Sequence, residues 1–242
     1  MVFAGGGAVQ SSKVIDISVA RVPRTVQQQK QFDSFTDLPD VPVLSETLLR
    51  MELQVRERVV DLDEISSVIL SDLGAAIQVI RMGGSEYGAL GSTPWRIADF
   101  VSSHGLEACL DAMSKCVVTR GAHYTAILDT WFHAKETAEI CRALAENLDG
   151  LLDQEDAYLV GLFHALGALP SVLGWDEWLS VPHDQALVGL GMAETWGLPS
   201  CVREYFMHSR KLKTSSRWTD LVDRAHRMLN SPWSIRSEGR SI

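Results

Sequence analysis

The sequence predicts an all-α fold, a bundle of several helices, and two observations lead to this prediction. From residue 38 to residue 229 apolar residues recur at spacings of three and four, the period of a helix that buries one face. The same region has neither a convincing alternation of apolar and polar residues nor the paired turn residues of a hairpin, so strands are not expected there. No internal repeat is visible, which argues against a repeat architecture.

Two parts are expected along the chain: residues 1–30 as an N-terminal arm, flexible or loosely packed, and residues 31–242 as one helical domain. The arm is rich in Gly, Ser, Val and Gln and shows no sustained period. Residues 14–22 do alternate in polarity, but a lone strand is unstable without a partner. No ordered strand is therefore predicted in the arm.

The first half of the domain begins with "LPDVPVL", whose two prolines set an extended lead-in to the first helix. The segment Ser66–Met82 then has helical period and ends at a pair of glycines. "WRIADFVSSHG" predicts a helix that ends on Gly105. "LEACLDAMSKCVV" predicts another short helix, with Val117 on its apolar face.

The second half contains the longest predicted helix, about Tyr124–Leu148, with a wide apolar stripe. The stretch that follows, "DQEDAYLVGLFHALGALPSVLGW", is apolar on nearly all sides after Ala157, which is typical of a central buried helix. Three further helices are predicted from "DQALVGLGMAETWG", which ends at Gly197, "PSCVREYFMHS" and "RWTDLVDRAHRML".

The charge balance argues against nucleic acid as the partner. Acidic residues outnumber basic ones by 31 to 22, a net charge of −9, whereas phosphate binding depends on clustered Lys and Arg. No apolar run of about 18 residues and no leader pattern occur, so we expect a soluble, cytoplasmic protein without membrane association. The cysteines are widely spaced and form no CxxC pair, which is typical of free thiols in a reducing compartment: Cys109, Cys116, Cys141 and Cys201.

Six stretches occur in an order that a known family shares. They are "LPDVPVL", residues 65–88, "WRIADFVSSHGLEACLDAM", the Trp131-x-His133 pair, "GLFHALGAL" and "ALVGLGMAETWGLP". Within residues 65–88, Asp72 keeps the acid of the family's turn, and Leu73 replaces its proline. This order resembles the HDOD domain, the HD-related output domain of bacterial signalling proteins, and it implies an HD-like helical fold.

The resemblance also implies where a metal site would lie. Related HD phosphohydrolases hold a divalent metal with a histidine, an adjacent His-Asp pair and a later Asp, and the metal activates water. His133 and His164 match the first two histidines, but Ala165 replaces the adjacent acid and Gln185 replaces a further family histidine. Hard divalent ions need carboxylate oxygens, so we expect neither catalytic residues nor a cofactor.

We expect the remnant of that site to be a pocket, and we predict that His164 is a core histidine whose ring bonds His133 or a backbone carbonyl. The pocket residues would be His133, His164, Trp131, Tyr87, Gln185 and His208. The alternative is a divalent metal site formed by His133, His164, His183, Asp184 and His208. Because Asp184 follows Ser180 and Pro182, capping of a helix is favoured over metal binding for its carboxylate.

Most of the seven tryptophans are expected to anchor helices in the core. Trp175 and Trp178 in "GWDEWL" are the exception, because Asp and Glu lie between them in a short turn. An exposed aromatic pair of this kind would be a candidate surface for docking a partner.

The function that the resemblance implies is that of a non-catalytic signalling or regulatory interaction module. Family members are often joined to receiver or cyclic-dinucleotide-handling domains, for which this sequence has no room, so a regulatory protein partner would be supplied in trans. One alternative is a divergent HD-type phosphohydrolase that depends on a divalent metal ion. Another is a small-ligand sensor that uses the remnant pocket, and the oligomeric state is left open.

Overall fold

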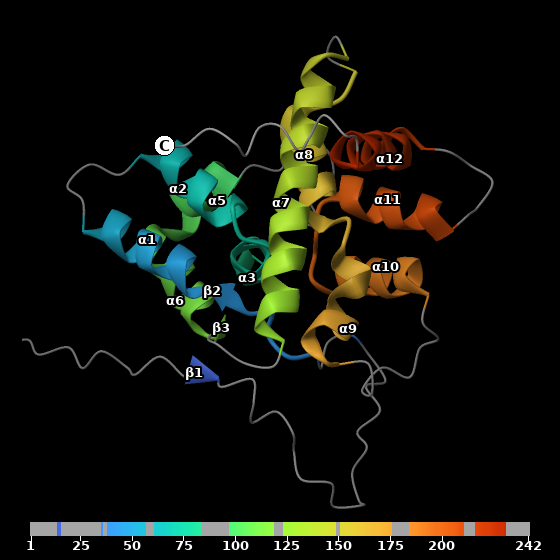
Figure 1. The fold of residues 1–242 in the computed structure, drawn as a ribbon. Helices are drawn as coiled ribbons and strands as arrows, with labels where there is room; N and C mark the ends of the chain where they lie inside the picture. The colour runs from blue at the N-terminus through green and yellow to red at the C-terminus, as the bar shows by residue number, and fades with distance from the viewer. Residues whose placement is uncertain are drawn as a thin grey trace, which may run out of the picture.

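The computed structural model describes residues 14–15, 35, 38–56, 61–83, 97–118, 123–148, 151–175, 184–210 and 216–230. In chain order the elements are β1 (Val14–Ile15), β2 (Val43–Leu44), α1 (Ser45–Val55), α2 (Leu62–Leu70), α3 (Leu73–Gly83), α5 (Ile97–His104), α6 (Leu106–Ser114), β3 (Val117–Val118), α7 (Tyr124–Glu146), α8 (Gln154–Phe163), the 3-10 helix η3 (Leu166–Ala168), α9 (Leu169–Leu173), α10 (Gln185–Thr195), α11 (Ser200–Arg210) and α12 (Arg217–Leu229). The predicted all-α helical bundle is confirmed, and Figure 1 shows its arrangement.

The helices are arranged around α7, which is 23 residues long and stands in the middle of Figure 1. The helices α1, α2, α3, α5 and α6 lie on one side of it, and α9 to α12 lie on the other. In the described part of the chain, α7 packs against α8 more extensively than any other two elements pack together. The last helix, α12, contacts α7, α8 and α11. The C-terminal end of the described chain therefore returns to the central helix pair.

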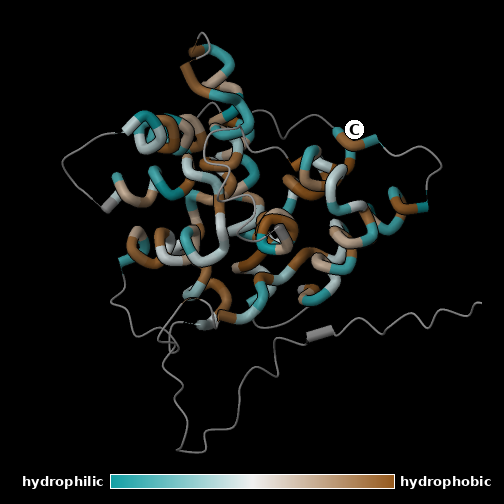
Figure 2. The backbone as a smooth tube through the Cα atoms, turned by 180° about the vertical axis from the view of Figure 1, so that it is seen from behind, coloured by the Kyte–Doolittle hydropathy of each residue, from teal (hydrophilic) through white to brown (hydrophobic). Residues whose placement is uncertain are grey.

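The hydrophobic core follows the periodicity that predicted the helices. In α7 a stripe of residues three and four apart is buried, from Ile127 to Ala145, and in α8 every residue from Ala157 to Phe163 is buried. Figure 2 shows apolar residues on the inner turns of the helices and hydrophilic residues on their outer turns. The predictions of a long amphipathic helix and of a central buried helix are both confirmed.

The segment Ser66–Met82, which the sequence presents as one periodic stretch, is divided into α2 and α3 at Ser71 and Asp72, with a bend of 115°. The physical cause is the buried carboxylate of Asp72. Its Oδ1 accepts hydrogen bonds from the backbone N–H groups of Gly74 and Ala75, at 2.8 and 3.1 Å, so it starts α3 as a cap does.

Asp72 also ties three separate parts of the fold together. Its Oδ1 accepts a hydrogen bond from the Trp131 ring nitrogen of α7 at 2.8 Å, and its Oδ2 accepts one from the Leu44 N–H of β2 at 2.8 Å. Burial raises the pKa of Asp72, and these hydrogen bonds act in the opposite direction. The carboxylate therefore holds the corner between α2 and α3 against α7.

A short parallel sheet was not expected from the sequence. Its strands have two residues each, in the order β1, β3, β2, and Val43 and Val14 both pair with Val117. Val117 thus lies on a strand and not on the apolar face of α6, because two-residue strands are too short to show an alternating pattern. Apart from Val14 and Ile15, the predicted arm of residues 1–30 lies outside the described residues.

One stretch, Gln154–Leu173, has the length and hydropathy of a membrane span, with a mean hydropathy of 1.4, and 67% of that window is buried inside the fold. The helices α2 and α3 pass the same composition test only as a pair, and that pair is sharply bent. Burial of this kind is typical of the core helix of a soluble helical domain.

Replacement of Asp72 by Asn should destabilise the fold by about 3 kcal/mol, because the new amide NH₂ would face buried N–H donors that now have a carboxylate acceptor. The measurement is chemical denaturation monitored by circular dichroism, with the midpoint and slope compared between the variant and the wild type.

The matched control is Asp61→Asn. Asp61 is exposed, and its carboxylate caps α2 by accepting the N–H groups of Asp63 and Glu64. Asn is as good a cap as Asp, so this variant should lose less than about 0.5 kcal/mol. Equal stability losses in the two variants would show that the buried carboxylate of Asp72 does not hold the corner.

Candidate functional site

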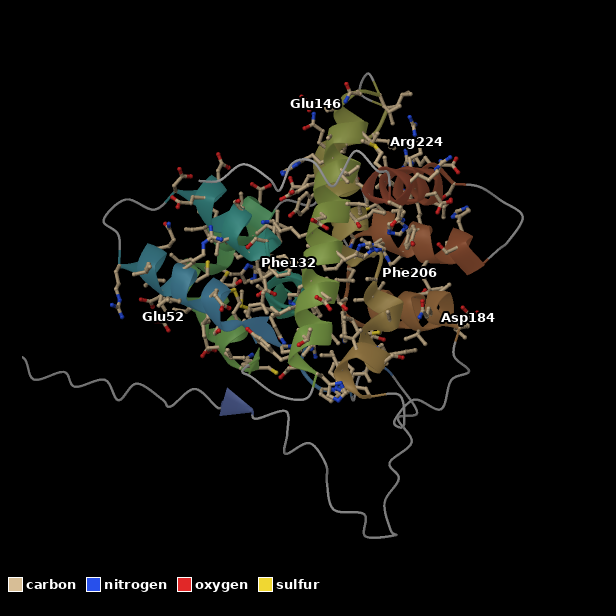
Figure 3. All side chains as sticks on the ribbon, in the orientation of Figure 1. Glu52, Phe132, Glu146, Asp184, Phe206 and Arg224 are labelled. Atoms are coloured by element: carbon tan, nitrogen blue, oxygen red, sulfur yellow. The ribbon has the colours of Figure 1, made fainter. Side chains whose placement is uncertain are left out.

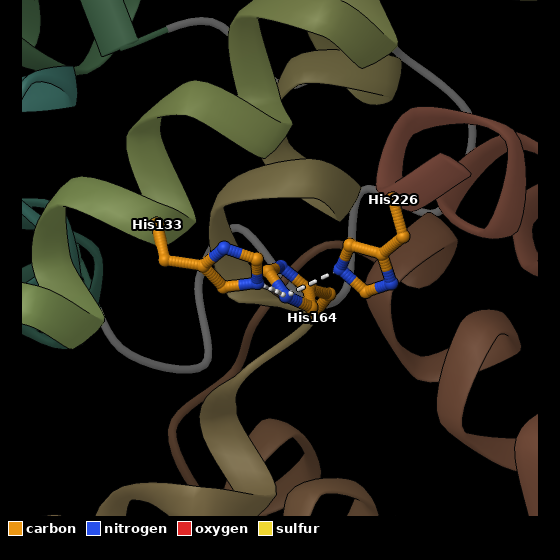
Figure 4. Close-up of side chains that lie close together, drawn as sticks. All are labelled: His133, His164 and His226. Atoms are coloured by element: carbon orange, nitrogen blue, oxygen red, sulfur yellow. Dashed lines mark hydrogen bonds between the residues drawn. The ribbon is translucent and has the colours of Figure 1, made fainter. Parts of the chain in front are cut away.

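Three histidines from three separate elements meet on one side of α7, as Figure 4 shows. His133 lies on α7, His164 follows the last residue of α8, and His226 lies on α12. The His164 Nε2 atom is 3.3 Å from His133 Nε2 and 3.1 Å from His226 Nε2. One ring nitrogen from each residue lies within 4.8 Å of the other two. His133 is exposed, whereas His164 and His226 are half-buried.

The approach of α8 to α7 positions the first two histidines. Gly161 of α8 lies directly against the α7 backbone, and a Cβ atom on it would be only 2.6 Å from the Ala138 Cα. Any larger residue would force the two helices apart. The helix then ends at Phe163, so that His164 projects from its last turn toward His133.

The tautomer of His164 follows from its second hydrogen bond. Its Nδ1 lies 2.6 Å from the Gly161 carbonyl oxygen, which can only accept, so Nδ1 must carry the proton. In the neutral ring this leaves a lone pair on Nε2, the atom that faces His133 and His226. The sequence predicted that the His164 ring bonds His133 or a backbone carbonyl, and the structure shows both of these contacts.

The electrostatics of the cluster favour the neutral form of His164 and of His226. Burial lowers the pKa of His164 from 6.5 to about 3, the Gly161 carbonyl acts in the opposite direction, and the charges of His226 and His133 lower it further. Burial and the charge of His133 also lower the pKa of His226, whereas Asp223 raises it. A neutral imidazole can accept a hydrogen bond or bind a metal through its free nitrogen.

Other predicted pocket residues do not meet at this cluster. Trp131 is buried, and its ring N–H donates to Asp72. His208 is half-buried on α11, where its Nδ1 bonds the backbone carbonyl of Glu204, and it is not part of the histidine group. His226 occupies the third place instead.

The acid of the alternative metal site caps a helix. Asp184 lies at the beginning of α10, as Figure 3 shows, and its carboxylate accepts hydrogen bonds from the N–H groups of Ala186 and Leu187. This is the capping role that the sequence favoured for it. Two of the other predicted site residues, Tyr87 and His183, lie outside the described residues.

The prediction that Trp175 and Trp178 form an exposed docking pair is wrong for Trp175. Trp175 is only 8% exposed and belongs to the hydrophobic core, so it does not offer a docking surface. Its backbone N–H donates to the Pro170 carbonyl, which keeps the residue folded against the end of α9. Trp178 lies outside the described part of the chain.

A small cavity of about 210 Å³ lies beside His164 and is lined in part by Gln185, Tyr205 and Ser209. The backbones of Gly167 and Gln185 are in close contact there, which brings η3 against the beginning of α10. Gln185 therefore lies near His164, as the sequence predicted, although its side chain is exposed.

A larger polar groove of about 840 Å³ is lined by none of the three histidines. It runs between α1, α2, α7 and α8, and its charged lining residues have both signs: Arg50, Asp63, Lys135, Glu139, Arg142, Asp153 and Glu155. Lys135 pairs with Glu139 at 3.7 Å, and the Arg142 guanidinium stacks over the ring of Tyr158. The groove therefore contains one ion pair and one cation-π contact on the α7 side.

The cysteine thiols do not supply a nucleophile. The four cysteines are free and buried. Burial raises the pKa of Cys109 to about 11 and that of Cys141 to about 12. The pKa of Cys116 is raised to about 11 by burial and by the negative charge of Asp40. The thiolate is the reactive form of cysteine, and burial in an apolar setting suppresses it.

The residues that converge do not fit the hard divalent metal of HD phosphohydrolases. Among the described residues, the group of ligand atoms that includes His133 and His164 contains three imidazoles and no carboxylate. Next to His164 stands Ala165, whose methyl group cannot coordinate an ion. Magnesium, calcium and manganese prefer oxygen ligands, so no hydrolytic step through such a metal follows from this geometry.

Helical periodicity carries only a weak signal for His226. On α12 the buried residues include Val222 and Ala225, so His226 lies at the edge of the buried face. Its periodicity places the ring near the core but does not say which helix it faces. The packing of α12 against α7 and α8, which brings the ring to His164, depends on tertiary contacts.

Stability should fall as the pH decreases from 6.5 toward 3, and His164 should account for part of the loss. The unfolded histidine binds a proton near pH 6.5, whereas the folded one resists protonation down to about pH 3, so acid favours the unfolded state. Between pH 7 and pH 5 the contribution is about 2 kcal/mol at most. It is measured as the slope of the unfolding free energy against pH, with a chelator present.

In the variant His164→Gln this slope should be shallower than in the wild type. His208→Gln is the matched control, because it removes a half-buried histidine that lies outside the cluster. If the unfolding free energy of His164→Gln has the same slope against pH as that of the wild type, the folded His164 ring takes up a proton as easily as the unfolded one.

Comparison with known proteins adds the family and the fold. A family model described as the HDOD domain matches residues 41–181. The MmoQ response regulator from Methylococcus capsulatus aligns with a TM-score of 0.61 and 18% identity, covering 81% of this chain and 91% of that chain. A fragment of the same regulator aligns with a TM-score of 0.57 and 15% identity, covering 84% of this chain and 92% of the fragment.

A candidate metal-dependent phosphohydrolase from Shewanella amazonensis aligns less well, with a TM-score of 0.39 and 19% identity, covering 81% of this chain and 79% of that chain. The search of curated proteins gave no match. At these identities the MmoQ structures show that the fold is shared and do not show a shared activity. The family model spans more than half of the chain, from β2 through α9, and includes His133 and His164. The chain belongs to the HDOD domain family.

Proposed function

We propose that the chain is a non-catalytic regulatory module of the HDOD type, which acts in the cytoplasm through a protein partner supplied in trans. The observation that carries this proposal is the chemistry of the histidine cluster. In HD phosphohydrolases the position after the second histidine bears an aspartate, and here it bears Ala165. The remaining ligand atoms in the cluster are imidazole nitrogens.

Two described acids on the helices that carry the histidines, Asp223 and Asp156, do not replace the missing carboxylate. Asp223 is on the exposed face of α12, and its carboxylate is not among the converging ligand atoms. Asp156 lies on α8 and accepts a hydrogen bond from the Cys201 thiol at 3.6 Å. Burial raises the pKa of Asp156, which makes it a poorer ligand for a cation. These placements support a module without hydrolytic chemistry.

The small cavity beside His164 favours an interaction module over a ligand sensor. Pockets that bind small molecules usually have volumes of about 300 to 1,000 Å³. The cavity here measures about 210 Å³, and half-buried or buried side chains of α11, including Tyr205 and Phe206, form part of its wall. Signalling is also the role named for the MmoQ response regulator, which shares this fold.

The purified protein should not hydrolyse a generic phosphodiester such as bis(p-nitrophenyl) phosphate in the presence of manganese or magnesium. The reason is that, among the described residues, no carboxylate oxygen joins the three imidazole nitrogens to hold these ions. Release of p-nitrophenolate should equal that of a sample without protein, and it should not change in His164→Gln.

Hydrolysis by the wild type that His164→Gln abolishes would overturn the non-catalytic assignment and favour a divergent phosphohydrolase.

The partner in trans is tested by purifying the tagged chain from the cells that normally produce it. Native mass spectrometry then gives the mass of the complex that contains the chain. A second polypeptide in fixed stoichiometry supports the regulatory module, and a chain recovered only as a free protein or with itself counts against a partner in trans.

A further inference from the structure

We infer that His133, His164 and His226 form a three-imidazole site for a borderline transition-metal ion, represented by Zn²⁺, in place of the hard-metal site of HD phosphohydrolases. The inference goes beyond the regulatory function proposed above and does not rest on it. It starts from the disagreement between the ligand set that HD enzymes use and the ligand atoms that converge here.

The spacing of the ring nitrogens fits one metal ion. In a tetrahedral zinc site with Zn–N bonds of 2.0 to 2.1 Å, the ligand nitrogens are about 3.3 to 3.4 Å apart. The Nε2 atom of His164 is 3.3 Å from that of His133 and 3.1 Å from that of His226. All three ligand atoms lie within 4.8 Å of one another, and the His133 and His226 rings are stacked with an interplanar angle of 19°, so one of these rings must turn for all three nitrogens to face one ion.

His164 is already oriented as a metal ligand. Histidines that bind metals usually donate their other ring N–H to a carbonyl or carboxylate, which fixes the tautomer and directs the free nitrogen at the ion. The Nδ1–H of His164 donates to the Gly161 carbonyl at 2.6 Å. Its Nε2 lone pair therefore points at the space between His133 and His226, as Figure 4 shows.

Hydrogen bonds alone leave the cluster incompletely satisfied. His164 Nε2 has a single lone pair, yet two other ring nitrogens lie within hydrogen-bond distance of it. If an N–H group of His133 donates to that lone pair, His226 has two options. Its N–H group must share the same lone pair, or its own lone pair must face the lone pair of His164. A metal ion removes this conflict because it accepts the lone pairs of all three rings.

The donor set selects the class of ion. Imidazole nitrogen suits zinc, copper, nickel and iron, whereas magnesium, calcium and manganese prefer carboxylate, carbonyl and water oxygens. Three histidines with a fourth position open to water form a known type of zinc site. The exposed His133 ring gives an ion a route from solvent.

A metal ion at this place would link parts of the fold that otherwise contact one another through side-chain packing. The three ligands come from α7, from the end of α8 and from α12. Of these, α12 lies beyond residues 41–181, the range of the family match. An ion held by all three rings would fasten α12 to α7 and to the end of α8.

The test is equilibrium binding of Zn²⁺ to the full chain, after removal of metal with a chelator, by isothermal titration and by metal analysis of the dialysed protein. The wild type should bind one Zn²⁺ per chain. His133→Gln and His226→Gln should each weaken binding more than about 100-fold, because even the loss of a group that only orients a ligand costs about 10- to 100-fold.

His208→Gln is the matched control, since it removes a nearby histidine outside the cluster and should bind zinc like the wild type. Zinc should also raise the Tm of the wild type and of this control but not of the two cluster variants. His133 is exposed, so His133→Gln keeps the test valid if His226→Gln does not fold.

The inference is overturned if the wild type binds Zn²⁺ no more tightly than the cluster variants do, or if His208→Gln loses zinc as they do. It is also overturned if Mg²⁺ or Mn²⁺ displaces zinc at similar concentrations. Absence of zinc binding would leave the non-catalytic function standing, whereas zinc binding with phosphodiester hydrolysis would overturn that function and keep the metal site.

Discussion

The close contact between α7 and α8 at Gly161 is the constraint on which the histidine cluster depends. Because Gly161 has no Cβ, the backbone of α8 can lie against that of α7 at Ala138. The same residue supplies the carbonyl that takes the Nδ1–H of His164. One glycine therefore sets both the distance between the two helices and the direction in which the His164 ring presents its free nitrogen to His133.

Much of the fold could be predicted from local pattern, because helical period and capping are properties of neighbouring residues. The apolar stripe of α7, the buried α8 and the cap at Asp184 were all predicted in this way. Periodicity did not show the break at Asp72, because apolar residues continue at helical spacing across it. Only the family resemblance indicated a turn there, and the carboxylate that caps α3 is held by Trp131 and Leu44 from distant parts of the chain. Two-residue strands such as that of Val117 were also beyond a periodicity argument.

The candidate site was predicted only in part, and the reason is similar. His133 and His164 were named from their place in the family order, and the structure brings them together. His208 was named with them, but its ring bonds a carbonyl of its own helix, and His226, which was not named, joins the cluster instead. Which of two late helices faces α8 is decided by tertiary packing, which no spacing in the sequence records.

The central claim is that three imidazoles converge where HD enzymes use carboxylates, and X-ray absorption at the zinc edge of the zinc-loaded protein tests it most directly. The account predicts scattering from three imidazole rings, with nitrogen ligands at about 2.0 to 2.1 Å and water completing the shell. In His226→Gln one ring should disappear from the signal. A zinc shell dominated by carboxylate oxygens, or one that His226→Gln does not change, would contradict the account.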